Sequence, residues 1–139
     1  MIYAFFKVWS VTTGVFLVGD VLWLTLVMNK FFVPQIKHLM DVTSNGTRIN
    51  YPSALIAYLL VSVALVWFVV MPFGKQPLMT VFLHGALLGF CLYGVYEFTN
   101  HATLISWPLS FLAIDVLWGT VWCGVASAIS VALINYFKI

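Results

Sequence analysis

Two matching acidic motifs contain the residues of this chain that are best suited to chemistry. The first reads Asp20-Val21-Leu22-Trp23-Leu24-Thr25, and the second reads Asp115-Val116-Leu117-Trp118-Gly119-Thr120. Five of the six positions are identical. Valine and leucine recur by chance in apolar segments, but an aspartate, a tryptophan and a threonine in the same register do not. The repeat therefore predicts that the two aspartates act together.

A third acid, Glu97, belongs to a polar stripe. Tyr93, Glu97, Asn100 and His101 follow one another at i, i+4, i+7 and i+8. This spacing places them on one face if the helix continues through His101. We therefore take Tyr93 and Asn100 as candidate binding residues beside the acids.

These residue types suit three kinds of chemistry. Carboxylate oxygens and an imidazole are ligands for magnesium, manganese or zinc, so a divalent metal ion is the candidate cofactor. Two neighbouring carboxylates repel each other and are expected to share a proton. Tryptophan rings beside acids attract organic cations. The candidate metal ligands are Asp20, Glu97, Asp115 and His101, and the candidate aromatic residues are Trp23 and Trp118.

Composition identifies the solvent that surrounds the protein. The 139 residues are 63% hydrophobic and only 7% charged, too few charges to cover a soluble domain. Lipids are therefore the expected partners of most of the exterior. A net charge of +2 without a basic cluster gives no indication of nucleic-acid binding.

Four apolar segments are long enough to cross a bilayer, which needs roughly 20 residues per helix. The sequence thus predicts an all-α membrane protein, a single four-transmembrane-helix bundle over residues 1–139. The helices are expected at about 4–28, 52–72, 78–98 and 108–135, and a polar loop with the turn-prone Ser44-Asn45-Gly46 at 29–51.

This topology brings the acids together. Asp20 comes late in the first segment, Asp115 early in the fourth and Glu97 late in the third, so all three fall in the same half of the membrane. An aspartate near the middle of a membrane helix costs about 2.5–3.5 kcal/mol on insertion scales. Protonation, a cation, water or hydrogen bonds must offset that cost. The plainest interpretation is that each acid accepts a hydrogen bond from an indole or hydroxyl of a neighbouring helix.

Other features have structural interpretations. Gly85 and Gly89, four residues apart, allow a close helix contact, which we expect within one chain rather than in a dimer. Cys91 and Cys123 are expected to be free thiols in apolar helices. An aromatic belt at the membrane interface accounts for the tryptophans near helix ends, which are Trp9, Trp67 and Trp107.

The run from Tyr96 to Thr120 resembles a known family. Tyr96-Glu97-Phe98-Thr99-Asn100, Trp107-Pro108 and the second acidic motif are similar to a family of small bacterial predicted membrane proteins classed as a domain of unknown function. The first acidic motif matches that family's other marked stretch. The resemblance implies a four-span fold and no activity. The family usually carries aspartate where this chain has Glu97, and the longer side chain loosens any tight metal geometry.

Three functions follow as hypotheses. The leading one is transport of a proton, a metal cation or a small organic cation through the carboxylate site, with a homodimer expected because four helices make a thin wall. The second is a membrane-embedded metal-dependent enzyme acting on a lipid or isoprenoid. The third is a non-catalytic ligand-binding, sensory or assembly protein. The expected location is a bacterial inner membrane, which the chain crosses several times.

Overall fold

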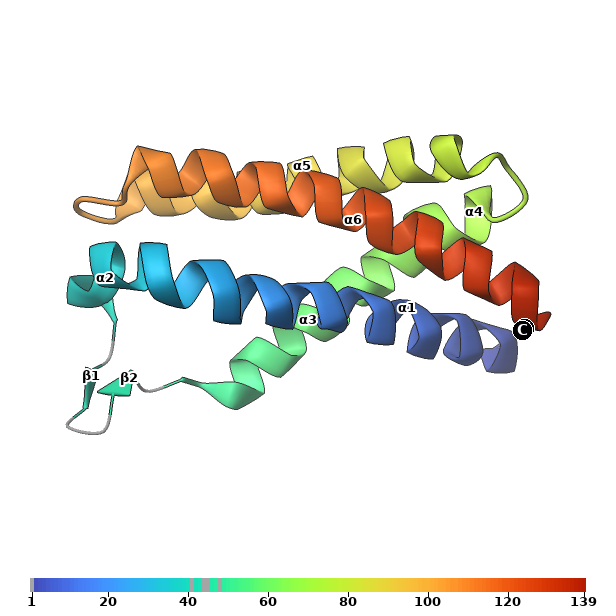
Figure 1. Cartoon of the computed structure of the whole chain (residues 1–139), viewed down its shortest axis with the longest axis horizontal. Coiled ribbons are helices and arrows are strands. Elements are labelled where there is room, and N and C mark those ends of the chain that lie inside the picture. The colour runs from blue at the N-terminus through green and yellow to red at the C-terminus, as the bar shows by residue number, and fades with distance from the viewer. Residues whose placement is uncertain (1, 41, 44–45, 48) are drawn as a thin grey trace.

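Four long helices form the protein, as the sequence predicts. The computed structural model describes residues 2–40, 42–43, 46–47 and 49–139. Its membrane-length helical segments are Tyr3–Leu39, Tyr51–Phe73, Leu78–Thr103 and Leu109–Phe137. The first helix begins, and the last one ends, at the same end of the bundle (Figure 1). The chain is therefore an all-α, multi-pass membrane protein.

The first helical segment is longer than predicted. It comprises α1 (Ile2–Trp23), the π-helix η1 (Leu24–Phe32), α2 (Val33–Ile36) and the 3-10 turn η2 (Lys37–Leu39). The expected loop at 29–51 is therefore helical up to residue 39. The physical reason is burial, because Phe32 and Ile36 pack against Trp23 and Phe111 in one apolar cluster.

Two short strands follow in the same connection. Strand β1 (Val42–Thr43) pairs antiparallel with β2 (Gly46–Thr47), and Thr43 lies opposite Gly46. Of the turn expected here, Ser44 and Asn45 lie outside the described residues.

Each of the other three helices has a proline next to its first residue. They are α3 (Tyr51–Leu65), which continues through the π-helix η3 (Val66–Val70) into α4 (Met71–Phe73), then α5 (Leu78–Thr103) and α6 (Leu109–Phe137). Pro52 sits in the first turn of α3, where a missing N–H is tolerated. There the Asn50 side chain accepts a hydrogen bond from the Ser53 N–H at 3.2 Å.

Both π-helical segments end two residues before a proline. In an α-helix, a proline ring collides with the carbonyl group four residues earlier and donates no hydrogen bond. A wider turn relieves that collision, since the residue before the proline then donates to the carbonyl five residues back. The N–H to O pairs are Val33 to Met28 before Pro34, and Met71 to Val66 before Pro72.

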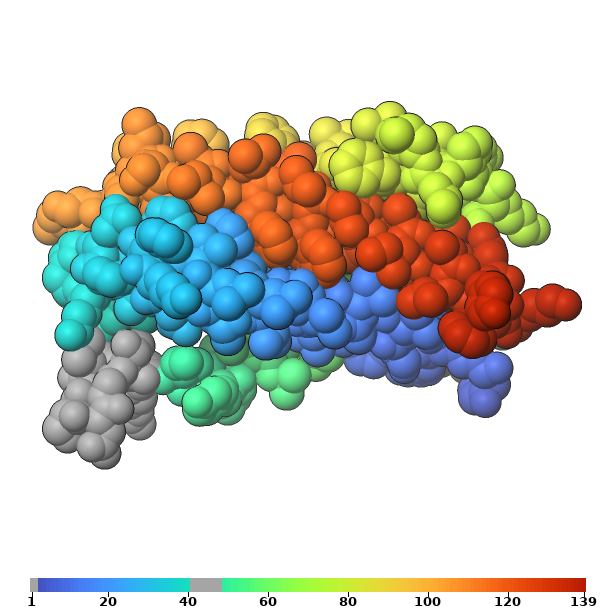
Figure 2. All heavy atoms as spheres, in the orientation of Figure 1, coloured from blue at the N-terminus to red at the C-terminus, as the bar shows by residue number. Residues whose placement is uncertain are grey.

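Helices α5 and α6 form the closest pair in the bundle. A Cβ atom on Gly89 would collide with the Gly119 carbonyl oxygen and with Cys123, and one on Gly85 would meet the Ser127 hydroxyl. The predicted Gly85–Gly89 spacing therefore serves a contact within one chain. Helix α1 lies along α6 over the visible face (Figure 2).

Helix α3 is set apart from the other three. It crosses behind α1 at an angle, and its N-terminal half diverges from α5 and α6 (Figure 1). The three helices that carry the acids are thus packed together, and α3 stands off from them at the end of the bundle where the acids lie.

The glycine contact gives the first testable prediction. Gly89→Val should destabilise the fold by about 1–3 kcal/mol, because the added side chain overpacks the α5–α6 contact. Thermal unfolding in detergent, followed by circular dichroism, should show a melting temperature lower by several degrees. The matched control is Gly94→Ala in the same helix, where a Cβ meets nothing within 4 Å. If Gly89→Val melts with the wild type, the two helices do not pack this closely.

Candidate functional site

Asp115 of α6 is bound by the tryptophan of the other motif. The Trp23 Nε1 group on α1 donates a hydrogen bond to Asp115 Oδ1 at 3.2 Å, and both side chains are buried. The Trp23 and Trp118 rings stack with 4.7 Å between centroids and 5° between planes. The two motifs therefore contact each other directly. Trp23 of the first motif donates to the aspartate of the second, and the two tryptophan rings are stacked.

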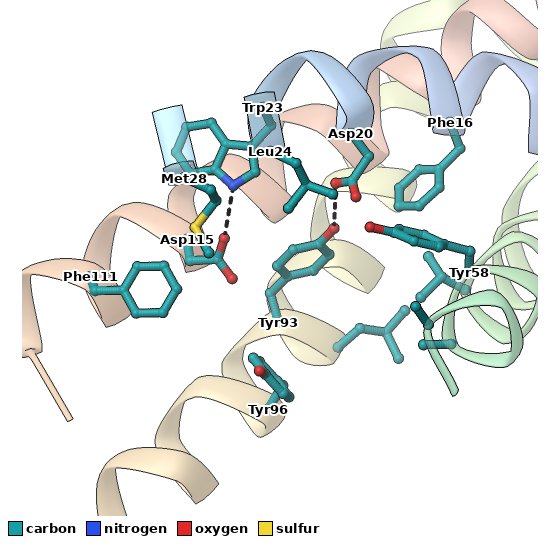
Figure 3. Close-up of a pocket in the computed structure, with 14 residues that line it drawn as sticks. Phe16, Asp20, Trp23, Leu24, Met28, Tyr58, Tyr93, Tyr96, Phe111 and Asp115 are labelled. Atoms are coloured by element: carbon teal, nitrogen blue, oxygen red, sulfur yellow. Dashed lines mark hydrogen bonds between the residues drawn. The ribbon is translucent and has the colours of Figure 1, made fainter. Parts of the chain in front are cut away.

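Asp20 of α1 occupies the equivalent place on the other side of this contact. Its Oδ1 accepts a long hydrogen bond of 3.4 Å from the Tyr93 hydroxyl of α5, and the Tyr58 hydroxyl of α3 lies beside it (Figure 3). Trp118 is close to this carboxyl, but its buried Nε1 has no partner with hydrogen-bond geometry among the described residues. The contact between the motifs is thus only approximately symmetric.

The one position at which the two motifs differ explains part of this asymmetry. A Cβ atom on Gly119 would collide with the Tyr93 ring, so only glycine lets that ring lie against α6. The corresponding residue of the first motif, Leu24, lines a cavity instead. Tyr93 can therefore reach Asp20 because the second motif has glycine where the first has leucine.

Glu97 of α5 has a different donor. It is 0% exposed, and its Oε2 accepts a hydrogen bond of 2.7 Å from Trp107 Nε1. Trp107 follows Ser106, whose φ of 61° reverses the chain between α5 and α6. The prediction that Trp107 belongs to an interfacial belt is therefore wrong, because the reversal turns its indole inward to a buried acid.

The Glu97 and Asp115 side chains adjoin. The two carboxyl groups are close enough for each to affect the charge of the other. Glu97 Oε1 is buried and has no hydrogen-bond partner among the described residues. A buried acceptor without a donor is costly, so this oxygen requires either a proton of its own or a hydrogen-bond donor.

A cavity of about 370 Å³ lies between α3 and the other helices. Asp20 and Asp115 both line it, whereas Glu97 does not. Its remaining wall is mostly aromatic and aliphatic (Figure 3). The lining side chains that matter below are Phe16, Trp23, Tyr58, Tyr93, Tyr96 and Phe111.

The four expected metal ligands do not come together. His101 lies in the last turn of α5, and residues 101–106 are all exposed. Within the described part of the chain, no group of three histidine, cysteine, aspartate or glutamate residues could hold a metal ion. Asn100 is half-buried and does not line the cavity.

Sequence reasoning missed Tyr58, Tyr96 and Phe111 as lining residues. Tyr58 had a usable signal, because a phenol hydroxyl inside an apolar segment needs a polar partner. The same signal applied to Tyr96, whereas Phe111 had none, since aromatic residues are common throughout the chain. Cys91 and Cys123 are free thiols, as expected.

Comparison with known proteins gives a family and no activity. A family model described as "Predicted membrane protein (DUF2177)" matches residues 5–132 of the chain. Neither a curated protein nor a solved structure shows significant similarity to it.

The Trp107–Glu97 contact gives the second prediction. Trp107→Phe should destabilise the fold by about 1–3 kcal/mol, because a buried carboxyl loses its indole donor. Trp67→Phe is the matched control, since Trp67 is 60% exposed. Thermal unfolding in detergent measures both variants. Equal melting temperatures for the two would show that the indole N–H contributes nothing to holding Glu97.

Proposed function

This chain belongs to the DUF2177 family of predicted membrane proteins, and we propose its function from the geometry of its buried acids, because the family description states no activity. The protein binds a small organic cation with an apolar body in the cavity beside Asp20 and Asp115, and carries that cation across the membrane. A homodimer in a bacterial inner membrane is part of the same proposal.

The observation that carries the proposal is the pairing of two acids with one cavity. Asp20 and Asp115 are 5% and 7% exposed, and both line a space of about 370 Å³, a volume within the range of small-molecule pockets. The described lining contains no lysine, arginine or histidine. A cationic ligand would offset the cost of keeping carboxylates in the membrane.

The aromatic lining favours an organic cation over a bare ion. Aromatic faces attract ammonium groups, most strongly where water is excluded. Four aromatic side chains with polar groups line the cavity: Trp23, Tyr58, Tyr93 and Tyr96. Magnesium and calcium ions instead require six or more oxygen ligands, and the cavity wall offers few oxygens in a mostly apolar surface. An anion would be repelled by both acids.

A structural role is the second candidate, and the hydrogen bonds favour it. Each acid accepts from an indole or a phenol, and two of these bonds join different helices. Such contacts fix helix register without any ligand. The two candidates differ in one respect. An asparagine at 115 can still accept from Trp23, so Asp115→Asn should leave a structural contact largely intact while weakening cation binding.

Binding of an aromatic ammonium ion provides the third prediction. Benzyltrimethylammonium should quench the fluorescence of the full chain in lipid nanodiscs, because Trp23 lines the cavity. Asp20→Asn and Asp115→Asn should each weaken binding by at least about tenfold, equivalent to about 1.4 kcal/mol. Uptake of the same cation into proteoliposomes should fall in parallel.

Two controls accompany this measurement. Neopentylbenzene has the same shape without the charge and should bind far more weakly. His101→Asn changes an exposed residue outside the cavity and should bind like the wild type. Equal binding of the neutral compound, or unchanged binding by both aspartate variants, would contradict the cation site. Binding without uptake would leave a receptor rather than a transporter.

A further inference from the structure

Glu97 is a buried acid that the cation site does not use directly. It lies outside the cavity lining and is fully buried. One of its oxygens accepts from Trp107 at 2.7 Å, and the other has no donor among the described residues. Asp115 also lies close to the Glu97 carboxyl, and Asp115 does line the cavity.

A hydrogen bond between two carboxyl groups requires a proton on one of them. Asp115 uses Oδ1 to accept from Trp23, and Glu97 uses Oε2 to accept from Trp107. If both groups were ionised, Glu97 Oε1 would have no donor, and two like charges would adjoin at low dielectric. One proton held between them removes both costs.

Within the part of the chain that the structure describes, no group next to the pair supplies a positive charge in place of that proton. The other titratable groups that face the pair are Asp20 of α1, Tyr58 of α3, and Tyr93 and Tyr96 of α5. Each of these is neutral or negative. The two indole donors are also neutral. The pair therefore depends on its own proton or on a cation brought to Asp115.

We propose that Glu97 and Asp115 share a single proton, and that an organic cation entering the cavity displaces it, so that the protein exchanges one proton for one cation. This inference rests on the proposed function. The O–H bond of the pair breaks, the proton leaves to water, and both carboxylates are then ionised. One positive charge enters as another leaves, so the net charge of the buried site is unchanged. Glu97 acts as a positioning residue that holds the proton without touching the cation.

The fourth prediction is that cation binding removes the proton shared by Glu97 and Asp115, which infrared spectroscopy and a proton-release assay can measure. The wild-type chain in nanodiscs at neutral pH should show the carbonyl-stretch band of a protonated carboxylic acid, and benzyltrimethylammonium should abolish it. A pH indicator in weak buffer should detect about one proton released per cation bound. Cation affinity should then rise about tenfold per pH unit over the titration range, because proton and cation compete.

Two variants at position 97 sharpen the test. In Glu97→Gln, the amide N–H can donate to Asp115 and stabilise its charge, so the band, the proton release and the pH dependence should all disappear while binding persists. Glu97→Asp keeps a carboxyl and should retain all three. Circular dichroism reports whether each variant is folded.

The possible outcomes distinguish a failure of the shared proton from a failure of the proposed cation site. Binding with no band and no pH dependence would overturn the shared proton and leave the cation site intact. Unchanged proton release from folded Glu97→Gln would likewise overturn the pair. If the cation fails to bind at any pH, the proposed function and the exchange both fail, and the band in ligand-free protein still decides whether the proton is shared.

Discussion

A carboxyl group inside a membrane needs hydrogen-bond donors, because lipid provides none. The described structure gives each of three acids one neutral donor: Trp23 for Asp115, Tyr93 for Asp20 and Trp107 for Glu97. The first two bonds run between helices, so a shift of α1 along α5 or α6 would leave a buried acid without its donor. These hydrogen bonds therefore fix the register of the helices. They also fix the positions of the aromatic side chains that donate them.

The antiparallel packing of α1 against α6 explains why the motif is repeated. Trp23 reaches Asp115 rather than the aspartate of its own motif, and it stacks on Trp118, which stacks in turn on Trp122. Glycine in place of leucine at 119 then breaks the symmetry by admitting Tyr93. Leu24 of the first motif therefore lines the cavity, whereas Gly119 of the second motif packs against the Tyr93 ring of α5.

Helix α3 contributes differently from the other three. Its first half diverges from α5 and α6 (Figure 1), and with Tyr58 it forms one wall of a cavity that two acids also line. The close packing of α5 and α6 holds the acids in position, and the divergence of α3 leaves the cavity beside them. A ligand site requires both, since the acids need fixed positions and the ligand needs room.

The sequence alone determined the four-helix membrane fold, the pairing of the two motifs and the common depth of Asp20, Glu97 and Asp115. These follow from apolar segment length and from the direction of each helix, which are local properties of the chain. Only the tertiary structure decided that Trp107 turns inward, that His101 faces outward and that Tyr58 lines a cavity. Each of these depends on which neighbour covers a given helix face, and no spacing within one segment specifies that. The extension of the first helix to residue 39 has the same origin, because Phe32 and Ile36 are buried by α6 residues distant in sequence.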